Sequence, residues 1–195
     1  MCLAKASTTG FGFRPIKKIA QNYNNAALSE YSVAASSALI SHACLVQLTA
    51  NGVVLASGNT DTNNLGTLNG VFYTDATSNK PTFSNFSPAS NTATDIVAFI
   101  NDDPMQMYEI MSADTAFNQN EVGHCADQVL EAGSSPLFIS KSKISATTAT
   151  TQAQLFIMGV SRDPDHSDTS AEGFALRVQI REHILVGNDT QRAGV

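Results

Sequence analysis

The sequence predicts a mainly all-β protein, an antiparallel β-barrel or sandwich with an extended N-terminal arm and little helix. From Ala43 onward the chain consists of short apolar runs separated by turn residues, which is typical of such folds. Near the C-terminus, apolar Leu176, Val178 and Ile180 alternate with polar residues. A period of two places these aliphatic side chains on one face of a half-buried strand. The dipeptide Asn51-Gly52 between two apolar runs adds a strong hairpin signal.

Residues 1–39 differ from the rest and are expected to form an extended arm and a first strand. The segment Gly10–Pro15 combines two glycines, two phenylalanines and a proline, and it is too short to build its own core. We expect a strand near 31–33, because serines and a β-branched valine weaken the alternative of a helix over 26–39. The arm either lies on a partner or folds back on its own domain. The candidate partner contacts are Phe11, Phe13, Arg14, Pro15 and Ile16.

Residues 40–187 are expected to form the β-rich body, with 188–195 as a tail. The predicted elements, in order, are a hairpin of 44–49 and 53–56, a strand at 70–73, an exposed loop over 80–92, a hairpin of 95–100 and 105–111, a short helix within 120–132, strands at 137–139 and 142–145, and a final strand pair, 154–161 and 174–183, joined by a polar loop. No internal repeat of fixed period is apparent.

Composition and charge disfavour several classes of function. The net charge of −6 and the pI near 5.0 argue against direct nucleic-acid binding, which needs clustered Lys and Arg. No apolar run approaches the length that spans a bilayer, so no membrane partner is expected. Three cysteines without Cys-x-x-Cys spacing suit synthesis in a reducing cytoplasm. Charged residues make up 14%, against an average of about a quarter, which leaves a neutral polar surface suited to protein contacts.

No group of residues forms a recognisable catalytic or cofactor motif, so we expect neither an enzyme nor a cofactor. Four groups of residues are considered as functional sites, and packing or turns explain each of them better. They are the His/Cys pairs at 42–44 and 124–125, considered as a zinc site; Asp163, Asp165 and Asp168, considered as a cation loop; Asp102 and Asp103, considered as paired carboxylates; and Gly10-Phe-Gly12, considered as a dinucleotide loop. A cation in the 163–168 loop stays open as an alternative to Asx-turns.

Four segments together resemble a known family. They are Phe11-Gly-Phe-Arg-Pro-Ile16, Asp102-Asp-Pro104 followed by Tyr108-Glu-Ile110, Gly159-Val-Ser-Arg-Asp-Pro-Asp165, and Val178-Gln-Ile-Arg-Glu-His183. In this order they look like proteins encoded beside the capsid genes of marine tailed bacteriophages. The matched segments cover a minority of the residues, at the beginning, middle and end of the chain.

The resemblance implies a structural virion protein that decorates or cements the capsid. Such a protein is made in the host cytoplasm, sits on the outer surface of the capsid, and binds the major capsid protein. It would also bind itself, as a homotrimer that suits a local symmetry axis. The alternatives are another virion component, such as a head–tail connector or tail protein, and a glycan-binding surface domain that uses the loops at 60–69 and 80–92.

Overall fold

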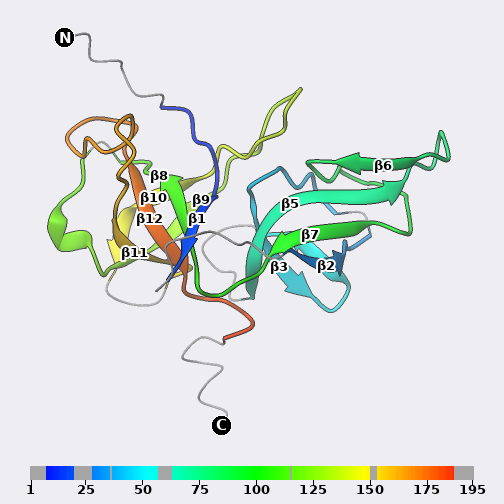
Figure 1. Cartoon of the computed structure of the whole chain (residues 1–195), viewed down its shortest axis with the longest axis horizontal. Helices are drawn as coiled ribbons and strands as arrows, with labels where there is room; N and C mark the ends of the chain where they lie inside the picture. Colours follow the sequence, from blue (N-terminus) through cyan, green and yellow to red (C-terminus); the bar gives the residue numbers. More distant parts are fainter. Residues whose placement is uncertain are drawn as a thin grey trace.

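The computed structural model describes residues 8–19, 28–35, 37–56, 63–114, 116–149 and 153–186, with the side chains of 146–149 excepted. These residues form two antiparallel sheets that lie side by side (Figure 1). Within the described ranges the helical structure is a short 3₁₀ turn, η1 (Gln119–Glu121). The prediction of an all-β, antiparallel fold with little helix is therefore confirmed.

Each sheet contains six strands among the described residues. The first sheet, in spatial order, consists of β1 (Arg14–Lys18), β8 (Gln106–Met111), β12 (Ala175–Ile180), β11 (Leu155–Val160), β9 (Cys125–Val129) and β10 (Lys143–Ala149). The second consists of β2 (Ser29–Ser32), β7 (Val97–Asn101), β5 (Asn64–Thr74), β3 (Leu45–Thr49) and β4 (Gly52–Leu55), with β6 (Pro81–Ser84) also paired to β5.

Both sheets curl, so that strands far apart in the sheet order meet. In the first sheet, Ala113 just after β8 donates its N–H to the carbonyl of Ile144 in β10 at 2.9 Å. In the second, Ala34 just after β2 donates to the carbonyl of Val53 in β4 at 3.0 Å. The curvature gives each sheet a hydrophobic cluster of its own. Strand β3 serves both clusters, because alternate residues of a strand point to opposite faces.

Two predicted hairpins are confirmed. Strands β3 and β4 pair around the turn at Asn51-Gly52, and β11 pairs with β12 with Ile157 opposite Val178. The predicted alternation in β12 also holds, because its aliphatic side chains are buried while Arg177 is half-buried. Local turn chemistry and a period of two were sufficient to identify these elements.

The predicted hairpin around 101–104 is wrong. A turn does form there, and the Asp103 side chain accepts a hydrogen bond from the Met105 N–H at 2.8 Å. However, β7 before the turn belongs to the second sheet, while β8 after it belongs to the first. Every residue of β8 is buried, and the strand lies between β1 and β12. A turn signal shows that the chain reverses, but it does not show which strands pair afterwards.

Three further elements differ from the predictions. The region 80–92 is not all loop, because its first part is β6. The region 120–132 holds the end of η1 and then strand β9 instead of a short helix. In place of a strand at 137–139, residues 135–137 form a turn, and Ile139 makes an isolated bridge with His42. Each region is short, and its pairing with distant strands outweighs its local propensity.

The N-terminal segment folds back on its own chain, which was one of the two alternatives left open. Strand β1 is hydrogen-bonded to β8, with Arg14 opposite Glu109. Phe13 is fully buried in the first cluster, with its ring 6.0 Å from that of Tyr108 in an edge-to-face arrangement. Residues 13–18 are therefore part of the first sheet and its core. The expectation that Phe13 anchors the chain to a partner is wrong, because its side chain has no exposed surface.

Phe13→Ala should lower the free energy of unfolding by about 3–5 kcal/mol, because it leaves a cavity in the core of the first sheet. Phe83→Ala is the matched control, since Phe83 is 63% exposed. The control should change stability by about 0.5 kcal/mol or less. Urea unfolding of both variants measures the difference, and similar losses from both would contradict the placement of Phe13.

Stability should fall as the pH drops below about 6.5, in part because of His183. Burial lowers the pKa of His183, and the nearby Asp102 and Asp103 offset this only partly. The unfolded chain therefore binds a proton more readily than the folded one, so stability that is present above the unfolded pKa is lost at lower pH. His183→Gln should flatten this slope between pH 5 and 6.5 in urea unfolding, and an unchanged slope would contradict the assignment.

Candidate interaction surface

Arg14 forms a polar node that fixes the N-terminal segment to the body. Its guanidinium lies 3.0 Å from the Glu109 carboxylate and 3.4 Å from that of Asp163. It also covers the Phe11 ring, 4.5 Å from the ring centroid, and Phe11 in turn contacts the ring of His166. Ion pairing and a cation–π contact thus hold Arg14 and Phe11 to the 162–173 loop.

The five residues predicted as partner contacts do lie together along one segment, but the contacts described for them are within the chain. Phe13 is buried, Phe11, Pro15 and Ile16 are half-buried, and the Arg14 side chain is 46% exposed. The segment needs two glycines to fit. Gly12 has a φ of +71°, and a Cβ there would lie 2.5 Å from the Ala43 carbonyl oxygen. This segment therefore supports the body and borders a surface instead of reaching away from it.

A projecting apolar loop, residues 134–139, lies beside this segment. Leu137 is 62% exposed and Ile139 is 40% exposed. The loop is held firmly, because the His42 N–H donates to the Phe138 carbonyl at 2.9 Å and the Asn85 side chain donates to the Leu137 carbonyl at 2.7 Å. Sequence reasoning missed this surface, since 137–139 resembled a buried strand. The serines and proline that precede Leu137 were the available sign of a loop.

The backbone of this loop is strained at a bulky residue. Phe138 has a φ of +48°, in the left-handed region that non-glycine residues rarely adopt. Its ring lies 4.1 Å from that of Phe86, centroid to centroid, and this stacking secures the conformation. Such strain costs on the order of 1–3 kcal/mol and is concentrated at functional sites.

A groove of about 350 Å³ separates the loop from the N-terminal segment. One wall is formed by Thr9, Gly10 and Phe11, and the other by residues 134–137 together with Ile139. Lys141 is the one charged residue in the lining. The groove is therefore mainly apolar.

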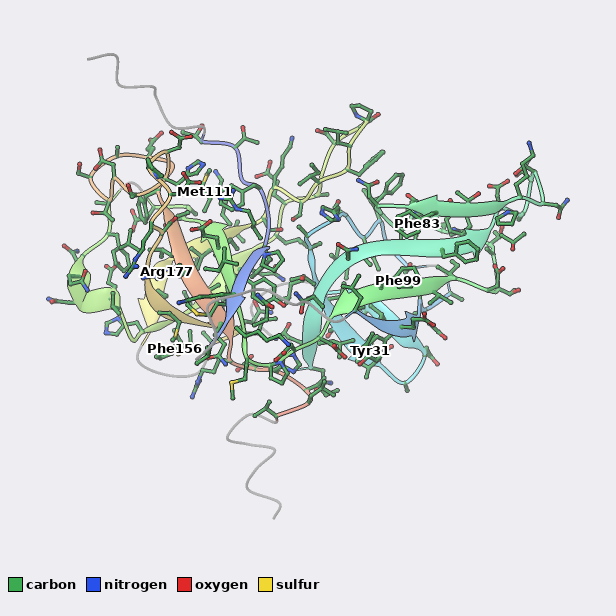
Figure 2. The ribbon with its side chains drawn as sticks, in the orientation of Figure 1. Tyr31, Phe83, Phe99, Met111, Phe156 and Arg177 are labelled. Carbon is green, nitrogen blue, oxygen red and sulfur yellow. The ribbon has the colours of Figure 1, made fainter. Side chains whose placement is uncertain are left out.

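The outer face of the second sheet carries a further group of exposed aromatic side chains. Phe72 in β5 pairs with Phe83 in β6, and both are exposed. The Phe83 ring lies across Gly70, where a Cβ would approach it to 2.9 Å, and its centroid is 6.0 Å from that of Phe99 (Figure 2). Phe72 and Phe83, together with Leu137 and Ile139, are called the apolar surface below.

Asn85 connects the two parts of the apolar surface. It follows Phe83 by two residues, and its side chain donates to the Leu137 carbonyl at 2.7 Å. The aromatic face and the projecting loop are therefore neighbours. Large exposed apolar side chains that adjoin one another are typical of protein interaction sites.

The residues considered for metal or acid–base chemistry have structural contacts. Burial raises the pKa of the Cys44 thiol to about 12, so it is neither a ready ligand nor a nucleophile. Asp163 and Asp168 each accept a backbone N–H two residues later, at 3.1 and 3.0 Å, as in Asx-turns. Asp102 accepts the Tyr31 hydroxyl at 2.7 Å. Among the described residues no three His, Cys, Asp or Glu side chains cluster as a metal site would require.

In comparisons with protein-family models, with curated proteins and with solved structures, no match to this chain was found. The described part of the chain contains no helix long and apolar enough to cross a membrane.

Arg14→Met should lower the free energy of unfolding by about 1–2 kcal/mol, because it leaves the largely buried Glu109 carboxylate without its cation. Arg162→Met is the matched control, since Arg162 is exposed in the same loop that Arg14 contacts. The control should stay within about 0.5 kcal/mol of the parent. Equal losses of stability from both variants in chemical denaturation would show that the contacts of Arg14 make no specific contribution to the free energy of unfolding.

Proposed function

We propose that this protein is a structural component of a bacteriophage virion, a decoration or cement protein on the outer surface of the capsid. Its partner is the major capsid protein, and it assembles as a homotrimer. The observation that carries the proposal is the apolar surface, in which Phe83 and Leu137 are more than 60% exposed on a rigid β-rich body. The family resemblance of four sequence segments supports the same role.

The energetics of the apolar surface suit a protein that binds in many copies. Apolar burial contributes about 25 cal/mol per Å², from which the costs of association are subtracted. A few side chains of the size of Phe and Leu supply about 1.5–3 kcal/mol each when fully buried. One copy is therefore bound modestly, while repetition over a shell and within a trimer makes the sum large.

The rest of the described structure supports a cement role. Cys44 and Cys125 are buried free thiols, as suits a chain made in the host cytoplasm before assembly. Both sheets are curled, and the strand ends are joined by backbone hydrogen bonds. Such a body can bear load between capsid subunits while it presents one adhesive surface.

Phe83→Asp and Leu137→Asp should each abolish sedimentation with capsid shells that lack this protein, while the melting temperature stays close to that of the parent. A carboxylate in either position would have to be desolvated on binding, and this outweighs the contribution of the contact. Leu185→Asp is the matched control, because Leu185 is 56% exposed and is not part of the apolar surface. Shell binding that survives both substitutions would contradict the proposal.

Copy number separates this proposal from the connector and tail alternatives. A gel of purified particles should show on the order of hundreds of copies for a cement protein and about a dozen or fewer for a connector. Light scattering of the purified protein tests the trimer.

The exposed pair Phe72 and Phe83 favours one second candidate function, glycan binding by stacking on a sugar ring. A glycan array that gives no signal would remove it.

A further inference from the structure

The groove beside Leu137 has the dimensions and lining of a site for part of a peptide segment. Its volume of about 350 Å³ is at the lower end of the range of about 300–1,000 Å³ that is typical of ligand pockets. Its apolar groups come from Phe11, Pro136, Leu137 and Ile139. Such a site accepts one or two large apolar side chains and is too small for an extended cofactor.

Both walls of the groove are fixed before a ligand arrives. The N-terminal wall is pressed so tightly against the body that any side chain at Gly10 would collide with the Lys141 carbonyl. Phe11 is held by Arg14 and His166, as described above. On the opposite wall, the Ser140 N–H donates to the His42 carbonyl at 2.8 Å. A preformed groove loses little conformational entropy on binding, so even a short segment can be held.

Lys141, the one charged residue of the lining, indicates which apolar segment fits best. Lys141 belongs to a chain of net charge −6, yet none of the ion pairs found among the described residues involves it. Glu131 accepts the Lys141 backbone N–H through its carbonyl oxygen but makes no ion pair with the side chain. A lysine in the lining of an apolar groove, outside those ion pairs, favours a carboxylate on the partner and disfavours a cation.

We propose that this groove binds a segment of the capsid protein in which a large apolar side chain is followed by a carboxylate. The apolar side chain enters between Phe11 and Leu137, and the carboxylate pairs with Lys141. This inference rests on the proposed function for the identity of the partner. The strained backbone at Phe138 is the cost of presenting Leu137 as one wall of the site.

The test is a titration of isotope-labelled protein by NMR with two capped hexapeptides, Gly-Ser-Leu-Asp-Ser-Gly and Gly-Ser-Leu-Lys-Ser-Gly. The first should shift the amide signals of Leu137, Ile139 and Lys141, and the second should bind more weakly. Lys141→Gln should weaken the first peptide about two- to fivefold and remove the difference between the two. Lys80→Gln, a substitution at an exposed lysine next to β6, should change neither.

A third peptide, Gly-Ser-Leu with a free carboxyl terminus, distinguishes a chain-terminal carboxylate from a side-chain one.

Equal binding of the acidic and basic peptides, or shifts confined to other parts of the protein, would overturn the inference. Shell sedimentation separates this result from the proposed function. If the parent protein sediments with shells but the acidic peptide causes no signal shifts, the groove assignment is wrong and the cement role is unaffected. If the acidic peptide binds but the parent protein does not sediment with shells, the cement role is wrong and the groove assignment is unaffected.

Discussion

The packing of Phe13 in the core of the first sheet holds the N-terminal segment in place against the body. Its ring packs edge-to-face on Tyr108, which places β1 along the fully buried strand β8. With β1 in place, Arg14 reaches Glu109, and Phe11 is positioned against His166. The same segment then forms one wall of the groove. A residue that was expected to anchor the chain to a partner thus positions one wall of a groove on its own chain.

The residues that stabilise the fold and the residues of the apolar surface lie in different parts of the molecule. The hydrophobic clusters inside the two curled sheets supply stability, since their members are close to fully buried. The apolar surface lies outside them, on a strand pair and a loop that are held mainly by hydrogen bonds and aromatic contacts. Side chains there can change without loss of the fold, and this makes a function based on contact testable by substitution.

Close backbone approach explains why glycines occur where they do. Gly10 and Gly12 let the N-terminal segment lie against the body, and Gly70 lets the Phe83 ring lie flat across the second sheet. A side chain at any of these positions would collide with a neighbour. The sequence showed flexible glycines next to aromatic residues, but it could not show which surface each of them approaches. Of the candidate site, Phe11 was identified from the sequence, and Phe72, Phe83, Leu137, Ile139 and Lys141 were not.

The fold class, the hairpin at Asn51-Gly52 and the final strand pair could be predicted from the sequence, because turn chemistry and a period of two depend on neighbouring residues. Three features emerge only in the folded chain: it crosses between the sheets at 101–104, its N-terminal segment folds inward, and Leu137 faces solvent. These outcomes depend on pairings between residues far apart in the chain. The free energy of such pairings comes from buried area and hydrogen bonds between distant strands, which local patterns do not encode.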